Sequence, residues 1–187
     1  MRYRTIVADP PWPSPQGFAA GHSRTPGKWE KPRTREPLKY PSMTFDAIKS
    51  IPVAEWAEPD ARLFLWTTNR WLPMSFDVLL AWGFIYRQVL VWHKSDVNLP
   101  SHIAPNSAEF ILIGVCGHPE RIGTLPTSVF TTARGKRHSA KPECFLDMVE
   151  QVSPGPYLEL FARRRRLGWH VWGDEVDSDI TLEATAS

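Results

Sequence analysis

The sequence has few cysteines and no long apolar run. Its two cysteines, Cys116 and Cys144, lie among apolar neighbours without the spacing of metal ligands, so they provide neither a disulfide framework nor a zinc site by themselves. The longest apolar stretch, residues 110–116, is far shorter than the roughly 20 residues that a membrane-spanning helix needs. No signal-peptide core follows Met1. These absences favour a globular protein of the reducing cytoplasm, without a membrane partner.

Basic residues are missing from the C-terminal end. Residues 174–187 contain five acidic residues and no lysine or arginine, which leaves 22 basic and 15 acidic groups in residues 1–173. A basic body is compatible with a polyanionic partner, although many proteins without such a partner share this pattern. We expect residues 176–187 to form an acidic, flexible tail.

Motifs of several common functions are also missing. We find no internal repeat, no glycine-rich phosphate loop and no cluster of histidines and cysteines with the spacing of metal ligands. An unrelated nucleotide-binding α/β protein is therefore a weak alternative, and no metal site is expected.

Apolar runs alternate with helical patterns along the chain. Many of the runs are continuous, as in strands that are covered on both faces of a parallel sheet. The pattern predicts one doubly wound α/β domain over residues 1–175. The predicted strands are residues 4–8, 62–67, 86–92, 109–115, 157–162 and 170–172, and the predicted helices are residues 45–50, 72–82 and 141–152.

Two polar, proline-containing segments, residues 13–39 and 93–108, separate these elements. Loops of this length are uncommon in compact domains unless they bind something or are disordered. We expect both to face the substrate.

The first predicted strand ends in Asp9, Pro10, Pro11 and Trp12. Each proline fixes its own φ and lacks an N–H, so the carbonyl groups here suit neither a helix nor a sheet and are expected to accept from a ligand. Ligands of α/β sheets bind at the carboxyl ends of the strands, where this tetrapeptide lies. A plain proline-rich turn with Trp12 as a lid on the core remains an alternative at this point.

The later blocks share one order with a known family. They are YPSMT at residues 40–44, LFLWTTN at 63–69, AWGF at 81–84, VWHK at 91–94, EFILIG at 109–114, HSAKP at 138–142, and LELFAR followed by GW and WGDE within 158–175. With the Asp-Pro-Pro-Trp tetrapeptide, this series closely resembles the DPPW-type adenine-N6 methyltransferases, the family of the messenger-RNA adenosine methylase and of many small bacterial and phage proteins. The resemblance covers residues 3–175, nearly the whole chain.

The resemblance implies methylation of the exocyclic amine of adenine with S-adenosylmethionine as cofactor, on a Rossmann-like sheet with a circularly permuted motif order. DNA is the favoured substrate because the chain resembles the compact bacterial and phage branch. An RNA adenine methyltransferase and a binding subunit that lacks catalysis are the alternatives.

The same resemblance assigns roles to residues. Asp9 and the carbonyl of Pro10 would accept the two hydrogens of the adenine amine and so localise its lone pair. Pro11 would complete the rigid turn, and Trp12 would stack on the base. The implied cofactor-binding residues are Asp9, Ser139, Lys141, Glu159, Arg163, Asp174 and Glu175. The implied substrate-binding residues are Trp12, Asn69, Lys94, Asn106 and Glu109.

For some of these residues a purely structural role remains an alternative. Lys141 could simply begin a helix, and Asp174 and Glu175 could be tail charge. Arg164, Arg165 and Arg166 could grip phosphates or be solvated. Trp66, Trp82, Trp92 and Trp172 are expected in the core, whereas the place of Trp71 is open.

The chain also departs from the family. Relatives carry Arg-Asn-x-His-Glu where this sequence has Pro105-Asn106-Ser107-Ala108-Glu109, so substrate contacts there are in doubt. Longer relatives have a segment before the catalytic strand that helps to hold the adenine of the cofactor. This chain begins at Met1, so we expect that pocket to be built differently or by a partner, either a second copy or another subunit.

Overall fold

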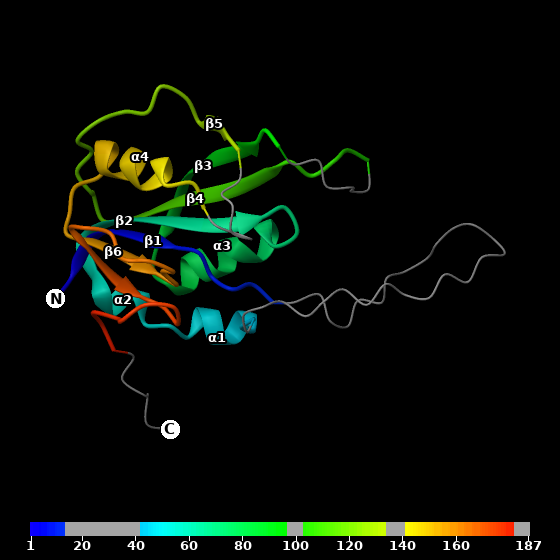
Figure 1. Ribbon diagram of the computed structural model, residues 1–187. Coiled ribbons are helices and arrows are strands. Elements are labelled where there is room, and N and C mark those ends of the chain that lie inside the picture. The colour runs from blue at the N-terminus through cyan, green and yellow to red at the C-terminus, as the bar shows by residue number, and fades with distance from the viewer. Residues whose placement is uncertain (14–41, 97–102, 134–140, 182–187) are drawn as a thin grey trace.

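One mixed sheet organises the chain (Figure 1). The structure is a computed structural model that describes residues 1–13, 42–96, 103–133 and 141–181. The sheet order is β5-β3-β4-β2-β1-β6-β7. The strands are β1 (Tyr3–Ala8), β2 (Ala57–Thr68), β3 (Ile85–Lys94), β4 (Ala108–Cys116), β5 (Val129–Thr132), β6 (Tyr157–Leu160) and β7 (Trp169–Trp172). The predicted single α/β domain is confirmed.

The sheet is not wholly parallel, which corrects the sequence-based prediction. β4 pairs antiparallel with both β2 and β3, whereas β1–β2, β1–β6, β3–β5 and β6–β7 are parallel. The continuous apolar run of β4 shows that the strand is buried but carries no information on its direction. The reversal has a functional consequence, because β4 begins at the edge where β1, β2 and β3 end.

Helices cover both faces of the sheet (Figure 1). They are α1 (Phe45–Lys49), α2 (Val53–Trp56), α3 (Leu72–Ala81) and α4 (Cys144–Val152). The hydroxyl of Thr44 accepts from the N–H of Ala47 and caps α1, while Gly83, with φ 82°, follows the end of α3. α2 and β5 were not predicted, because four residues are too few to show a period.

Two apolar clusters fill the space between sheet and helices. Side chains of α1, α2 and α3 pack on one face and include Ile48, Val53 and Leu79, all 0% exposed. Phe145, Leu146 and Val149 of α4 pack on the other face against Trp66 and Trp92. The prediction that Trp66, Trp82 and Trp92 belong to the core is confirmed, since each is at most 2% exposed.

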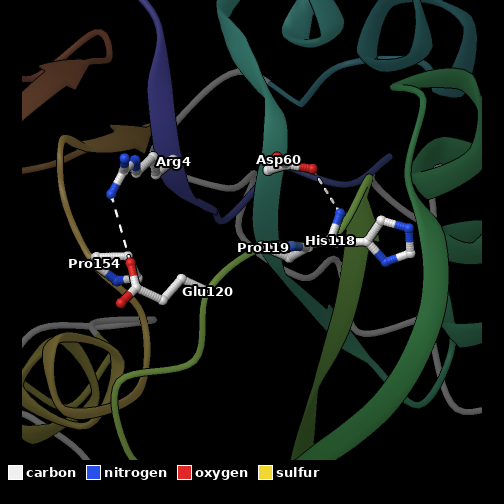
Figure 2. Close-up of a pocket in the computed structure, with 6 residues that line it drawn as sticks. All are labelled: Arg4, Asp60, His118, Pro119, Glu120 and Pro154. Carbon is white, nitrogen blue, oxygen red and sulfur yellow. Dashed lines mark hydrogen bonds and ion pairs between the residues drawn. The ribbon is translucent and has the colours of Figure 1, made fainter.

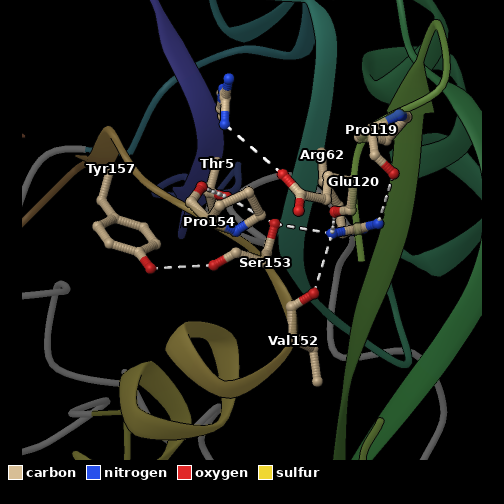
Figure 3. A network of polar contacts seen from close by, with 9 residues as sticks. Thr5, Arg62, Pro119, Glu120, Val152, Ser153, Pro154 and Tyr157 are labelled. Carbon is tan, nitrogen blue, oxygen red and sulfur yellow. Dashed lines mark hydrogen bonds and ion pairs between the residues drawn. The ribbon is translucent and has the colours of Figure 1, made fainter. Parts of the chain in front are cut away.

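Arg62 ties together three segments at the edge where the parallel strands begin (Figure 3). Its guanidinium donates to the carbonyls of Pro119, Glu120 and Val152 and, at 2.8 Å, to the hydroxyl of Ser153. This network joins β2, the segment after β4 and the end of α4. It therefore stabilises the edge of the sheet where the parallel strands begin, which is opposite the edge that carries the predicted site.

The prediction that the chain is flexible from residue 176 onwards is wrong for the first residues of that segment. The N–H of Val171 donates to the Asp179 carboxylate at 2.9 Å, and the N–H of Asp179 returns a bond to the Val171 carbonyl at 2.8 Å. Ile180 packs against the core. These contacts cover the open edge of β7, which would otherwise expose unpaired backbone groups. Residues 182–187 lie outside the described residues.

Candidate active site

Five segments from distant parts of the chain meet at one edge of the sheet. β1 runs directly into Asp9, β3 ends at Lys94, and Glu109 is the second residue of β4. Glu109 pairs in register with Thr68, the last residue of β2, and Asn69 is the next residue after Thr68. Lys141 comes shortly before α4. The fold therefore brings together Asp9, Asn69, Lys94, Glu109 and Lys141, as the predicted site requires.

The charged members form one alternating chain. The ammonium of Lys141 lies 2.7 Å from Asp9 Oδ2 and 3.4 Å from Glu109 Oε2. The ammonium of Lys94 pairs with Glu109 Oε1. Lys94 and Glu109 side chains are each 13% exposed, so solvent screens their pair only weakly. The order Asp9–Lys141–Glu109–Lys94 gives the cluster no net charge.

Burial and pairing act against each other on these groups. Burial is the largest influence on Asp9 and raises the pKa of its carboxyl, although Lys141 pulls the value down. Burial would raise the pKa of Glu109, but Lys141 and Lys94 outweigh it and lower the value. Burial would lower the pKa of Lys141, but Asp9 and Glu109 outweigh it and raise the value. Lys141 and Glu109 are therefore charged at neutral pH, and Asp9 is the member of the cluster whose pKa burial moves towards the neutral form.

The prolines shape the turn as expected, but their carbonyls are not wholly free. The N–H of Trp12 donates to the Pro10 carbonyl at 2.8 Å, and the N–H of Met43 donates to the Pro11 carbonyl at 2.9 Å. A carbonyl oxygen has two lone pairs. Each carbonyl oxygen therefore has a second lone pair that these two hydrogen bonds leave unused.

Trp12 belongs mainly to the core. Its side chain is 9% exposed, its indole N–H donates to the Trp66 carbonyl at 3.1 Å, and its ring packs against Phe45. So little of the ring is accessible that stacking of a base on its face is not supported, and Trp12 instead acts as a lid on the core. Its indole hydrogen bond anchors the tetrapeptide beside β2.

Glu159 is a half-buried acid, one of whose carboxylate oxygens is buried and unsatisfied. It lies on β6 in register with Val7 of β1, two residues before Asp9. Its Oε2 is buried without a hydrogen-bond partner among the described residues. Burial raises the pKa of Glu159 to about 7, with Asp9 adding to the effect and Arg164 opposing it. A buried polar atom without a partner costs about 1–3 kcal/mol and calls for an explanation such as a ligand.

The backbone just after β6 is unusual. Phe161 has φ 62°, a left-handed conformation that is rare for a bulky residue, and its ring packs edge-on against Trp172 at 5.2 Å. Such backbone strain concentrates at functional sites. Here it turns the chain from Glu159 towards Arg163, two of the predicted cofactor-binding residues.

The four consecutive arginines pair with acidic side chains of the protein itself. Arg163 binds Glu175 at 2.6 Å, so these two predicted cofactor-binding residues are brought together. Asp174 lies exposed next to them. The side chains of Arg164 and Arg165 are 47% and 52% exposed, so these two are solvated as well as paired, and the charge of the run is balanced by acidic side chains of the protein. The other pairs are Arg164 with Glu143, Arg165 with Asp179, and Arg166 with both Asp147 and Glu150.

Some predicted positions remain untested. Ser139 and most of segment 13–39 lie outside the described residues, as do residues 97–102 of segment 93–108. Asn106 is half-buried just before β4. That second segment is shorter than predicted, because β3 extends through Lys94 and β4 starts at Ala108.

A separate hollow lies at the opposite edge of the sheet (Figure 2). It is lined by Arg4, Asp60, His118, Pro119, Glu120 and Pro154. Its polar groups satisfy one another: the N–H of His118 donates to Asp60 at 2.7 Å, and Arg4 lies 3.8 Å from Glu120. None of the predicted site residues lines it.

The described residues also lack two kinds of feature. The described residues hold no group of three or more histidine, cysteine, aspartate or glutamate side chains that could bind a metal ion. No helix in the described ranges is long and apolar enough to cross a membrane.

Sequence reasoning assigned Lys94 and Glu109 to the substrate and missed that they are bonded to each other and, through Lys141, to Asp9. The partners are far apart in the chain, 132 residues in the case of Lys141 and Asp9. Pairing over such a separation leaves no local pattern in the sequence.

Comparison with known proteins agrees with this geometry. The chain is 29% identical over 192 residues to the type II methyltransferase M.MunI of Mycoplasma sp, covering 97% of this chain and 81% of that protein. It is 26% identical over 194 residues to the human N(6)-adenosine-methyltransferase catalytic subunit METTL3, covering 97% of this chain but 30% of that protein. An N(6)-adenosine-methyltransferase MT-A70-like protein of Arabidopsis thaliana is 26% identical over 185 residues, covering 94% of this chain and 24% of that protein. Residues 3–175 match the MT-A70 family, and because this match spans almost the entire chain, the protein belongs to the MT-A70 family.

Proposed function

We propose that this protein transfers a methyl group from S-adenosylmethionine to the exocyclic N6 amine of adenine in DNA. The observation that carries the proposal is the Asp9–Lys141 pair at 2.7 Å, which ends the chain of charges at the carboxyl edge of β1. A zwitterionic amino-acid group needs one carboxylate and one ammonium as partners, and this pair supplies both.

The residues present fit the cofactor. Asp9 would pair with its amino group and Lys141 with its carboxylate. The unpartnered Oε2 of Glu159 supplies an acceptor for ribose hydroxyl groups, and Arg163 with Glu175 lies at the end where the adenine would be held. When bound, the cofactor supplies a methyl group made electrophilic by its sulfonium sulfur.

The chain itself contributes positioning and charge stabilisation. The Asp9 carboxylate and the free lone pair of the Pro10 carbonyl accept the two hydrogens of the adenine amine, so the lone pair of N6 is localised on nitrogen. The positive charge that develops there is stabilised by the same carboxylate. Preorganised groups of this kind are worth about 10²–10³ in rate each, and holding the reactants in line adds more.

The share of each relative's length that this chain spans favours DNA over RNA as the substrate. The chain spans most of the bacterial type II methyltransferase but less than a third of the human and plant adenosine methyltransferases. The match is therefore more complete with the type II methyltransferase than with the adenosine methyltransferases. RNA remains the second candidate, because METTL3 is named as an adenosine methyltransferase and is similar over 97% of this chain.

The substrate is tested by expressing the protein in a bacterial host that lacks adenine methylation. Nucleosides from purified DNA and RNA are then separated and quantified by mass spectrometry. N6-methyladenine should accumulate in DNA and not in RNA above the level seen with an Asp9→Ala variant. Methylated RNA beside unmodified DNA would reverse the substrate assignment, and sequencing of the methylated DNA gives the target site.

Glu109 should affect binding of the charged cofactor through its own charge. Glu109→Gln keeps the shape of the side chain but changes the cluster Asp9–Lys141–Glu109–Lys94 from neutral to positive. S-adenosylmethionine carries a net positive charge, whereas its demethylated product is a neutral zwitterion. We expect the Kd for S-adenosylmethionine to rise about tenfold, which corresponds to about 1.4 kcal/mol, and the Kd for the product to change much less.

Calorimetry without nucleic acid measures both constants. Glu150→Gln is a matched control, because Glu150 also pairs with a basic side chain, that of Arg166, but lies on α4 and outside the charge chain. Both of its Kd values should equal those of the wild type. Equal losses for cofactor and product in Glu109→Gln would show that Glu109 does not act through charge. If both Kd values are unchanged in Glu109→Gln, Glu109 does not contribute to cofactor binding and can act only on the substrate.

A further inference from the structure

Arg70 and Trp71 form an aromatic and cationic surface beside the site that the proposed chemistry does not use. They follow Asn69 directly after β2, at the edge that carries Asp9, and precede α3. Arg70 is exposed and Trp71 is half-buried. The guanidinium carbon of Arg70 lies 4.9 Å from the centre of the Trp71 ring, within the range of a cation–π contact.

The backbone holds this pair rigidly. The N–H of Trp71 donates to the Thr68 carbonyl at 3.0 Å. The carbonyl of Trp71 accepts from the N–H of Ser75 at 3.0 Å and from its hydroxyl at 2.7 Å. The hydroxyl of Ser75 is itself bonded to Thr67 at 2.6 Å in the core. Trp71 is therefore fixed to both β2 and α3, which suits a preorganised binding surface.

A row of rings connects the pair to the catalytic tetrapeptide. The Trp12 ring lies 5.8 Å from Phe45, and Phe45 lies 5.2 Å from Trp71, both measured between ring centres. Successive bases of a stacked strand are about 3.4 Å apart. Trp71 thus lies within a few nucleotides of an adenine whose amine is bound at Asp9.

The chemistry of the pair suits a nucleobase. Unpaired bases stack on aromatic rings and on the flat face of arginine, and every base offers such a face. The positive charge also favours a polyanion. Trp12 is too deeply buried for this role, whereas Arg70 is exposed and Trp71 is half-buried.

We propose that Arg70 and Trp71 form a stacking platform for a nucleobase that flanks the target adenine. This inference rests on the proposed nucleic-acid substrate and names a further contact with it. Because stacking is tolerant of base identity, the platform adds affinity and not sequence preference. A platform contact of this kind changes the affinity for nucleic acid roughly tenfold.

The test uses oligonucleotides that carry the target site with its adenine unmethylated and, in each member of a series, one abasic position near that adenine. With the wild-type protein, one position should raise the KM for the oligonucleotide about tenfold when its base is removed. Arg70→Ala should raise the KM of the intact oligonucleotide by the same factor and should show no further loss at that position. The kcat and the Kd for S-adenosylmethionine should be unchanged. The inference is overturned if Arg70→Ala responds to every abasic position as the wild type does.

Two variants separate stacking from charge and from general effects. Arg70→Lys keeps the charge but loses the flat guanidinium, so it should behave as Arg70→Ala in the abasic series; full recovery would indicate a phosphate contact and overturn stacking. Arg87→Ala removes another exposed arginine, near the start of β3, and should match the wild type; the same loss in this variant would also overturn the assignment. If the wild-type protein methylates no nucleic acid, the proposed function fails together with this inference. If it methylates nucleic acid but shows no Arg70-dependent position, only this inference fails.

Discussion

Replacement of Asp9 by alanine should lower methyl transfer by at least about 10³-fold while the protein remains folded. The substitution removes the acceptor of the adenine amine and also one partner of the cofactor. Folding should persist because Lys141 keeps Glu109 as a partner at 3.4 Å, so no lone buried charge is left behind.

The measurement is single-turnover transfer of a labelled methyl group, with thermal unfolding as the check on the fold. Asp9→Asn serves as the matched variant, since it keeps an oxygen acceptor and loses the charge. It should retain more activity than Asp9→Ala and less than the wild type. An Asp9→Ala protein with full activity would refute the role of the carboxylate.

Glu159 should make both stability and cofactor binding depend on pH around neutrality. The pKa of its carboxyl rises from 4.5 to about 7 in the folded protein because of burial. Between these values the folded protein keeps a proton that the unfolded chain has lost, so the free energy of unfolding falls as the pH rises through this window and is level above it. The total change is about 3 kcal/mol, at about 1.4 kcal/mol for each pH unit.

Glu159→Gln removes this titration. The stability of the variant relative to the wild type should therefore increase by about 3 kcal/mol between about pH 4.5 and about pH 8, as measured by urea unfolding at each pH. Burying the amide of the Glu159→Gln variant has a cost in stability that does not depend on pH. This cost therefore cancels when the difference between variant and wild type is compared at two pH values. A constant difference across the range would show that Glu159 is already ionised at low pH.

The same residue links cofactor binding to proton release. If the ionised carboxylate accepts ribose hydroxyl groups, the affinity of the wild type for S-adenosylmethionine should fall about tenfold from about pH 8 to about pH 6. Calorimetry in buffers of different ionisation enthalpy should detect a proton released on binding near pH 7. Glu159→Gln should show neither effect. Proton uptake by the wild type would contradict the assignment of Glu159 to the cofactor.

The order of elements and the position of the tetrapeptide could be predicted from local signals. The apolar run before Asp9, the cap at Thr44 and Gly83 after α3 each act within a few residues of the chain. Such signals are readable because strand and helix periods and cap residues are local properties. The same holds for the core tryptophans, which lie within apolar runs.

The direction of β4 and the short elements α2 and β5 could not be predicted. An apolar run is the same in either direction, and four residues show no period. The direction of β4 determines the composition of the site, because an antiparallel β4 presents Glu109 at its start beside the ends of β2 and β3. In a parallel β4 that residue would lie at the opposite edge.

The sequence by itself determined the α/β class, the tetrapeptide after the first strand and the family. Only the tertiary structure decided that Trp12 is a lid rather than a stacking ring, that the arginine run is neutralised internally, and that Asp9, Lys141, Glu109 and Lys94 form one chain of charges. The reason is physical: burial and ion pairing depend on residues that are distant in sequence and meet only when the sheet is assembled.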